Sequence, residues 1–399
     1  MSLSASIGSS CAADPHEAGV DACRGALVRL GPQKADLAIV FASARYDQEK
    51  VLSGVHETAG GALVVGSSTA GEITTEGPLA RHSVAVMLVA SDTVRFFAAV
   101  DAHVAADARA AGKSVAHQVK VAAGEELKAF LMFPDVLAGN GADIVRGVGD
   151  ALGPHFPVVG GASGDDFRFE KTFQYLGERA YSGAVVALGF AGVFSMGIGV
   201  KHGWVPIGMP LVATRSQGAV LHELDHRPAI SIYEDYFGPK EARQLREEQL
   251  GRLAITYPLG MRVEGSDEML IRDALSVDEH GSITCAAEIP EGAEIQLMVG
   301  SRENAIKVAQ EAAEHALAQL EGRAPKAIII FNCIARSKLF GERSGEEIAA
   351  IQSVLGRDVP LIGFYTYGEQ APLGGEVRNI ERCNPAFHNE TVVICAFAE

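Results

Sequence analysis

The sequence contains no cluster of positive charge. Its 399 residues include 34 Lys and Arg against 50 Asp and Glu, which gives a formal net charge of −16. Proteins that bind nucleic acid or anionic membrane surfaces do so through grouped Lys and Arg side chains. We therefore expect neither nucleic acid nor a membrane surface among the partners of this chain.

Long apolar stretches are also missing. The longest, around residues 183–200, is interrupted by glycines and has the pattern of two strands rather than of a span across a bilayer. Residues 1–14 have no basic segment ahead of a continuous apolar core, so they are not predicted to be a secretory signal. The six cysteines form no Cys-x-x-Cys pair and fit reduced thiols. We expect a cytoplasmic location.

What the chain does contain is abundant glycine and a repeated pattern. Forty-four glycines, a hydrophobic content of 48% and an aromatic content of 7% fit an α/β protein with many tight strand ends. An apolar strand, a helix and a second apolar strand recur over residues 35–66, 128–159 and 326–362. Strands that are apolar throughout indicate crossover connections and sheets covered by helices.

Paired strands are predicted as hairpins over residues 81–100, 183–200 and 282–299. The predicted fold class is α/β, with mixed β-sheets built from repeated strand–helix–strand–hairpin units in two domains. The predicted divisions are an N-terminal segment and helix over residues 1–34, a first domain with two units over 35–228, and a second domain with the third unit over 229–399.

Each unit ends in a related loop. A strand runs into a glycine, and a carboxylate closes the loop at Val64–Ile73, Val158–Asp165 and Pro360–Pro372. The Gly-x4-Gly spacing of the first and third loops is that of a P-loop, which places Lys after the second glycine. Glu72 and Glu369 occupy that position, so we do not expect a nucleotide triphosphate. The alternative is that the glycines only turn the chain and the acids cap the following segments.

Polar residues at these loops form the candidate ligand site. Open α/β sheets bind ligands at the carboxyl ends of their strands, and hydroxyls with carboxylates suit a small polar molecule that carries an amine. Arg336 is a candidate carboxylate clamp or, alternatively, a structural partner of Glu342 or Glu369. The candidate ligand-binding residues are Ser67, Ser68, Thr69, Glu72, Asn332, Cys333, Arg336, Tyr365, Tyr367, Gly368, Glu369, His388 and Asn389.

One motif is interpreted as accidental. Residues 222–226 match the zincin pattern His-Glu-x-x-His, in which two imidazoles share one zinc only when the pattern lies on a helix. Pro228 follows closely, and the apolar residues around the motif favour a strand that enters a turn. On a strand the two histidines would lie about 13 Å apart. We expect no metal site here.

Taken together, these segments resemble the FIST family of sensory proteins, which have a FIST N and a FIST C region. The likeness covers nearly the whole chain from about residue 35 onward. It rests on Val65–Glu72, Val159–Asp165, Gly199–Pro206, Leu224–Tyr233, Pro258–Gly260, Asn332–Arg336, Gly363–Glu369 and His388–Thr391.

The resemblance implies an intracellular input module that binds small ligands, proposed to include amino acids. Some members resemble haem-based nitric-oxide sensors that act on a partner histidine kinase, and His202 and His388 are the candidate haem ligands here. No kinase, cyclase or chemotaxis segment accompanies the two regions, so we expect any output to run through a separate protein. The sequence leaves a homo-oligomer open.

Three hypotheses of function follow. The first is a bacterial sensor that binds an amino acid or a similar small polar molecule. The second is a haem-binding nitric-oxide sensor that acts on a histidine kinase. The third is a hydrolase-like enzyme that uses Cys333 or a tyrosine. No Gly-x-Ser-x-Gly elbow occurs, so a ligand-binding protein without catalysis is favoured.

Overall fold

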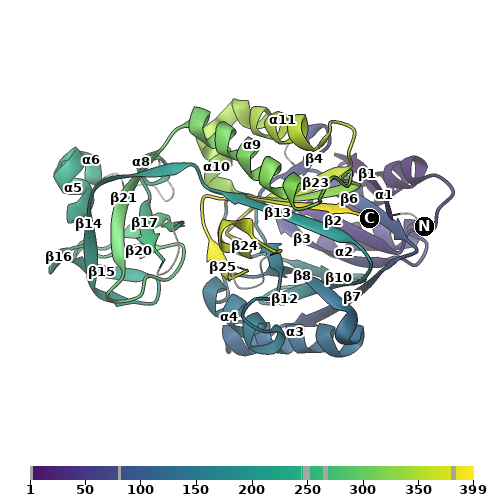
Figure 1. Ribbon diagram of the computed structural model, residues 1–399, viewed down its shortest axis with the longest axis horizontal. Coiled ribbons are helices and arrows are strands. Elements are labelled where there is room, and N and C mark those ends of the chain that lie inside the picture. Colours follow the sequence, from purple (N-terminus) through teal and green to yellow (C-terminus); the bar gives the residue numbers. More distant parts are fainter. Residues whose placement is uncertain (1–2, 80–81, 244, 246–251, 264–267, 379–382) are drawn as a thin grey trace.

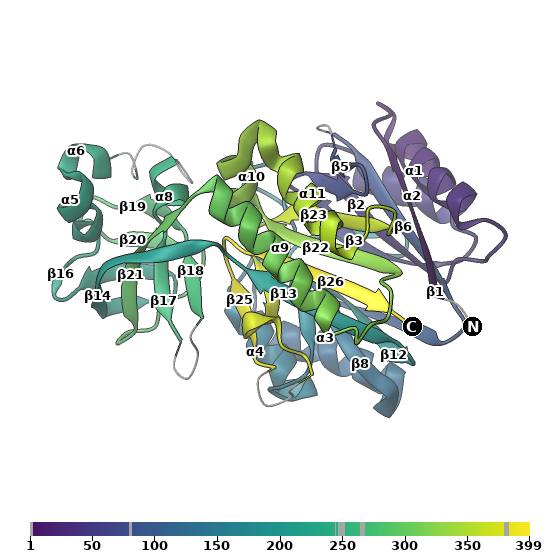
Figure 2. The same cartoon turned by 45° about the horizontal axis from the view of Figure 1, so that its top comes forward.

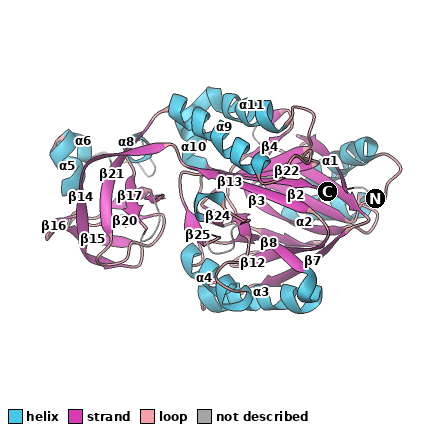
Figure 3. Cartoon of the chain, in the orientation of Figure 1, coloured by secondary structure: helices cyan, strands magenta, loops and turns pink. Residues whose placement is uncertain are grey.

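The computed structural model of the chain describes all residues except 1–2, 80–81, 244, 246–251, 264–267 and 379–382. Three six-stranded sheets surround one apolar interior, helices cover their outer faces, and a smaller domain of strands and short helices lies at one end (Figure 1). Figure 3 shows how the helices enclose the strands. The predicted α/β class with mixed sheets is confirmed.

The three large sheets come from three units with the same order of elements. The first unit comprises β1 (Leu3–Ser10), α1 (Pro15–Leu30), β2 (Leu37–Ser43), α2 (Gln48–Thr58), β3 (Leu63–Thr69), β4 (Glu72–Thr74), β5 (Gly77–Pro78) and β6 (Val84–Ser91). The second comprises β7 (Val94–Asp101), α3 (Ala108–Ala123), β8 (Leu127–Pro134), α4 (Gly141–Leu152), β9 (Val158–Gly161), β10 (Gln174–Leu176), β11 (Arg179–Tyr181) and β12 (Val185–Gly192). The third comprises β13 (Ser195–Lys201), α9 (Arg302–Ala318), β22 (Ala327–Cys333), α10 (Ile334–Phe340), α11 (Ser344–Leu355), β23 (Leu361–Thr366), β24 (Glu369–Pro372), β25 (Pro385–His388) and β26 (Val392–Ala398).

Each unit sends its short hairpin into the sheet of another unit. The sheet orders are β1-β6-β2-β3-β10-β11, β7-β12-β8-β9-β24-β25 and β13-β26-β22-β23-β4-β5. In each sheet the third and fourth strands are parallel and the other pairs are antiparallel. The exchange closes a circle, from the first unit to the third, from the third to the second and from the second to the first. The three units are therefore interlocked.

The hairpins predicted over residues 81–100 and 183–200 are wrong. β6 and β7 follow each other in the chain but belong to different sheets, and so do β12 and β13. The third predicted hairpin, over residues 282–299, is also wrong, because its two strands pair with other strands. Apolar strand patterns show that both faces are buried, but they do not identify the neighbouring strand.

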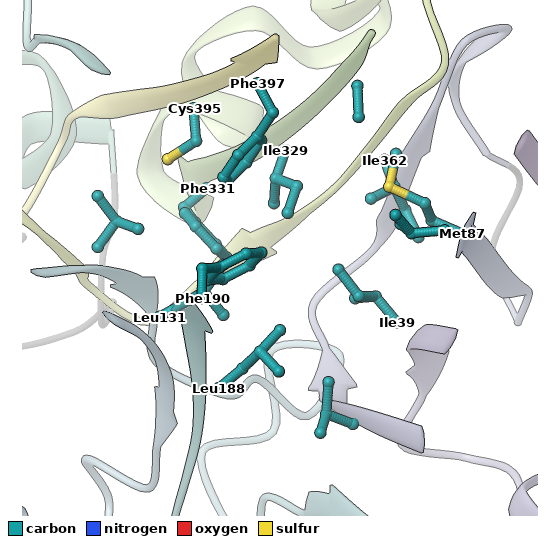
Figure 4. Packing of buried hydrophobic residues seen from close by; sticks show 14 of the residues in the cluster. Ile39, Met87, Leu131, Leu188, Phe190, Ile329, Phe331, Ile362, Cys395 and Phe397 are labelled. Atoms are coloured by element: carbon teal, nitrogen blue, oxygen red, sulfur yellow. The ribbon is translucent and has the colours of Figure 1, made fainter. Parts of the chain in front are cut away.

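Alternation along each strand explains the two kinds of core. In β2, Leu37, Ile39 and Phe41 point into the interior shared by all three sheets, while Ala38 and Val40 lie beneath α1 and α2. Figure 4 shows side chains of the three sheets meeting in that interior. The pairs α3 with α4 and α9 with α11 cover the other two sheets in the same way.

The repeated glycines are required by close approach of neighbouring strands. A Cβ atom on Gly66 would lie 1.8 Å from the carbonyl oxygen of Val40. The equivalent distances at Gly160 and Gly363, to the carbonyl oxygens of their own parallel neighbours, are 2.2 and 2.4 Å. These glycines therefore pack the sheet, which accounts for their recurrence without a phosphate.

A fourth sheet forms the smaller domain, which is inserted into the third unit between β13 and α9 (Figure 2). Its elements are β14 (Trp204–Gln217), β15 (Val220–Leu224), β16 (Arg227–Pro228), α5 (Ser231–Phe237), α6 (Pro239–Ala242), α8 (Arg252–Thr256), β17 (Leu259–Arg262), β18 (Met269–Arg272), β19 (Ala274–Val277), β20 (Ile283–Cys285) and β21 (Glu294–Gly300). The boundary predicted at residue 228 falls inside this domain, directly after β16.

The N-terminal segment contains more structure than the sequence indicated. The predicted helix is present as α1. Ahead of it lies β1, a strand that was not predicted, which pairs antiparallel with β6. Leu3, at the start of β1, is hydrogen-bonded to the C-terminal residue Glu399, and β1 and β26 lie away from the inserted domain (Figures 1 and 2). Within the described part of the chain, no helix is both long and apolar enough to span a membrane.

Candidate functional site

The acid of the third glycine loop is buried in a set of hydrogen bonds. Glu369 begins the exchanged strand β24 and has no exposed surface. Its carboxyl group accepts hydrogen bonds from the hydroxyl of Thr366 and from the hydroxyl and backbone N–H of Thr391, the last two at 2.7 and 3.2 Å. Burial raises the pKa of Glu369 to about 8, so the carboxyl group is largely protonated at neutral pH.

Glu72 has the same place in the first unit. It begins β4, and the hydroxyls of Thr69 and Ser83 donate to its two carboxyl oxygens. Burial raises the pKa of Glu72 to about 7. Both acids thus fasten an exchanged hairpin to the loop before it and to the start of the last strand of the unit.

In the second unit this position belongs to Gln174, not to Asp165. Gln174 begins β10, and its amide donates to the Ser163 hydroxyl at 3.1 Å while its oxygen accepts the backbone N–H of Ala184 at 3.2 Å. Asp165 instead accepts backbone N–H groups of residues 169–171 and the hydroxyl of Tyr367. The interpretation of Asp165 as the equivalent acid is therefore corrected.

Arg336 is a buried structural cation. Its guanidinium group pairs with Glu347, with both side chains fully buried, and it lies 5.7 Å from the ring of Trp204. It also donates to the backbone carbonyl groups of His202 and Ala305, the latter at 3.0 Å. The structural pairing considered for Arg336 is present, but its partner is Glu347 rather than Glu342 or Glu369.

Most other candidate residues are also buried within the fold. The Ser68 hydroxyl donates to the carbonyl of Gly164 at 2.7 Å, and Tyr367 stacks on Phe169 at 4.4 Å between ring centres. Burial raises the pKa of Cys333, which disfavours the reactive thiolate. The remaining candidates with less than 5% exposure are Ser67, Thr69, Asn332, His388 and Asn389, while Gly368 packs against Phe387.

A cavity of about 560 Å³ opens where the three units meet, and we call it the three-unit cavity. It lies between the loop that follows β3, the segment that follows β9, and α10 with the start of α11. Two of the candidate residues, Glu72 and Tyr365, line it. Its walls are formed by Arg45, Ala70, Gly71, Glu72, Pro78, Leu79, His82, Asp166, Phe167, Ser337, Lys338, Gly341, Ser344 and Tyr365.

The three-unit cavity has charged groups of both signs. Asp166 is half-buried, and its carboxylate accepts a hydrogen bond from Ser43 at 2.7 Å. The Lys338 ammonium lies 4.8 Å from the ring centre of Phe167, and Arg45 adds a second cation to the wall. A site with anionic and cationic groups suits a ligand that carries both an amine and a carboxylate.

Tyr365 supplies an unpaired polar group to this wall. Its hydroxyl is buried and makes no hydrogen bond of full geometry, although the hydroxyls of Ser337 and Ser344 lie close enough to lower its pKa. Burial raises the pKa of this phenol, so it is a neutral donor. Ser344 also begins α11, whose twelve residues direct the positive end of a helix dipole to this side. A ligand oxygen would satisfy the hydroxyl.

Sequence reasoning missed Arg45, His82, Asp166 and Lys338, which complete the cavity. They come from all three units, and no local spacing connects them. His82 and Asp166 gave a weak signal in the sequence, because they are polar residues close to the ends of loops. In the structure both have positive φ angles, of 64° and 57°.

The residues proposed as haem ligands do not fit a haem group. The backbone N–H of Trp204 donates to Nδ1 of His202, and Nε2 of His388 bonds to the carbonyl of Ala371, each at 3.0 Å. Neither imidazole lines the three-unit cavity. His388 is buried, so a haem there would require the surrounding packed core to open, and Nδ1 of the half-buried His202 is already occupied by the backbone.

The described residues contain no group of three or more His, Cys, Asp or Glu side chains that could hold a metal ion. In the zincin-like segment, His222 lies on strand β15, and His226 lies in the turn after it with a φ angle of 62°. The prediction that this motif lies on a strand and its turn is confirmed.

Proteins with related sequences include the uncharacterized protein Rv0628c of Mycobacterium tuberculosis, 29% identical over 224 residues, which are 56% of this chain and 58% of that protein. The uncharacterized protein Mb0898c of Mycobacterium bovis is 28% identical over 250 residues, 62% of this chain and 61% of that protein. The matches thus span about three fifths of the length of these relatives.

Two solved structures align over 100% of both chains with a TM-score of 0.36. They are a chorismatase, at 9% identity, and a cyanuric acid hydrolase from A. caulinodans, at 8%. Similarity this low supports no argument about this chain.

Family models give a specific result. The FIST N domain matches residues 36–227, and the FIST C domain matches residues 229–372. These two matches cover most of the chain, and the protein therefore belongs to the FIST family, whose domains are associated with sensing in signal transduction.

Proposed function

We propose that this protein is a sensor that binds a small zwitterionic molecule, an amino acid or a close analogue, in the three-unit cavity. The observation that carries the proposal is the combination of opposite charges with the unpaired Tyr365 hydroxyl in a volume of about 560 Å³. Pockets for small molecules have volumes of roughly 300–1,000 Å³. The ligand's amine would face Asp166, and its carboxylate would face Lys338 and the Tyr365 hydroxyl.

α10 connects this cavity to the inserted domain. Ser337 and Lys338 line the cavity, while the adjacent Arg336 donates to the carbonyl of His202, just before the chain enters β14. A ligand that favours one position of α10 would also favour one position of the inserted domain, provided its affinity differs between the two states. We propose that a separate signalling protein, such as a histidine kinase, detects this change.

Amino acids are expected to stabilise the protein, because a ligand that binds only the folded state raises the unfolding midpoint. A thermal-shift screen with the twenty amino acids should identify at least one, and calorimetry should then give its dissociation constant. Asp166→Asn keeps an acceptor for Ser43 but removes the charge that faces the amine. We expect it to weaken binding by about ten- to a hundredfold, the worth of a charge-assisted hydrogen bond.

Asp21→Asn is the matched control, because Asp21 is an exposed residue of α1 outside the cavity. It should bind the ligand as the unmodified protein does. If no amino acid shifts the midpoint, the ligand class is wrong. If Asp166→Asn binds with unchanged affinity, the ligand lies elsewhere.

A further inference from the structure

A second cavity, of about 610 Å³, lies between the inserted domain and the three-unit core. We call it the junction cavity. α8 and the end of β21 contribute its inserted-domain wall, and the start of α9 and the end of α10 contribute its core wall. α8 and α10 lie next to each other there (Figure 1). Its lining residues are Arg252, Ile255, Thr256, Gly300, Arg302, Lys338 and Leu339.

The charge of this lining is unlike that of the whole chain. Three of its seven residues are cations and none is an acid, although acids outnumber bases by 50 to 34 in the sequence. Glu303 and Glu346, whose pKa values Arg302 lowers, both also pair with Arg343. Among the described residues, the lining of this cavity therefore carries positive charge only, in a protein that is acidic as a whole.

Two further features favour an anion in the junction cavity. Nε of Arg302 donates to the carbonyl of Leu339 at 2.5 Å, which holds the guanidinium group at the cavity wall. Arg302 also begins the seventeen-residue helix α9, so the positive end of that helix dipole lies at the same wall. Thr256 adds a hydroxyl that can donate to an anion oxygen.

We propose that the junction cavity binds a small phosphate-bearing anion that joins the inserted domain to the core. A guanidinium group binds two phosphate oxygens at once through parallel hydrogen bonds. Three cations also balance the two or more negative charges of a phosphate better than the single charge of a carboxylate. The cavity volume is that of a small-molecule site. Arg252 and Thr256 hold the anion from the inserted domain, and Arg302 and Lys338 hold it from the core.

The bound anion restrains the inserted domain. β14 and β21 make the two covalent connections between this domain and the core, and the anion adds a non-covalent one next to them. Lys338 lines both the junction cavity and the three-unit cavity. A substitution of Lys338 would therefore change both sites at once. Arg252 and Arg302 line the junction cavity and not the three-unit cavity, so they test the junction cavity separately.

Calorimetry with pyrophosphate as the probe, at constant ionic strength, tests the proposal on the full chain. We expect saturable binding at one site, weakened at least tenfold in Arg252→Gln and, separately, in Arg302→Gln. Arg179→Gln, on strand β11 far from the junction, is the control and should bind as the unmodified protein does. Circular dichroism without ligand checks that each variant is folded. If one of the two variants does not fold, the other one is sufficient for the test.

Three outcomes overturn the proposal: no binding of pyrophosphate, equal binding by both cavity variants, or tighter binding of succinate than of pyrophosphate. The last outcome would assign the site to carboxylates. Amino-acid binding is measured in parallel with Arg252→Gln, which should leave it unchanged. The failure of the anion site and the failure of the amino-acid site are therefore distinguishable.

Discussion

Replacing Arg336 by methionine is expected to lower the free energy of unfolding by about 3–5 kcal/mol, the usual cost of removing one partner of a buried ion pair. The substitution leaves the fully buried Glu347 carboxylate without its cation. It also removes donors from the carbonyls of His202 and Ala305, on the two sides of the inserted domain in the chain. Urea unfolding followed by circular dichroism measures the loss.

Arg343→Met is the matched control for Arg336→Met. Arg343 also pairs with glutamates, but at an exposed site where such pairs contribute about 0–1 kcal/mol. The double variant Arg336→Met/Glu347→Gln should recover part of the loss, because it removes the unpaired charge. A loss below about 1 kcal/mol in Arg336→Met would contradict the structural role and favour the alternative that Arg336 is a ligand clamp.

The second large effect is a fall in stability as the pH rises. Burial raises the folded-state pKa of Glu369 from 4.5 to about 8 and that of Glu72 to about 7. A raised pKa means that the folded state binds the proton more tightly than the unfolded state does. The resulting stabilisation is fully present below pH 4.5 and is lost as the pH rises to about 8. At 1.36 kcal/mol per pKa unit, Glu369 alone accounts for roughly 3–5 kcal/mol.

Glu369→Gln should remove most of this pH dependence. Gln174 shows that glutamine fits the equivalent position of the second unit, donating to a hydroxyl and accepting a backbone N–H. We therefore expect little loss of stability at pH 5 and a gain of a few kcal/mol at pH 9. Urea unfolding at both pH values measures the difference, and Glu49→Gln, at an exposed site on α2, is the control. Equal pH slopes in Glu369→Gln and the unmodified protein would contradict the assignment.

The units were visible in the sequence because their signals are local. Apolar runs, glycine-ended strands and helical spacing do not depend on distant partners, and together with the loop motifs they predicted the α/β class and the FIST resemblance. Sheet membership is not local. The turn between β6 and β7 has the chemistry of a hairpin, yet it carries the chain between two sheets.

The candidate site shows the same division. From the sequence, Glu369 and Arg336 were polar residues at strand ends, the positions from which ligands are often bound. The structure buries both of them. Thr366, at the end of β23, and Thr391, just before β26, bind Glu369, and α11 supplies Glu347 to Arg336. Only Glu72 and Tyr365 of the predicted set reach the three-unit cavity.

The sequence by itself determined the three repeated units, their glycine-ended strands and the family to which the chain belongs. Only the tertiary structure decided which polar residues are left to face a ligand. The three-unit cavity joins Arg45, Asp166 and Lys338, one from each unit, and the junction cavity joins the inserted domain to the core. The other candidates are buried within the closed exchange of hairpins, and no spacing along the chain encodes that exchange.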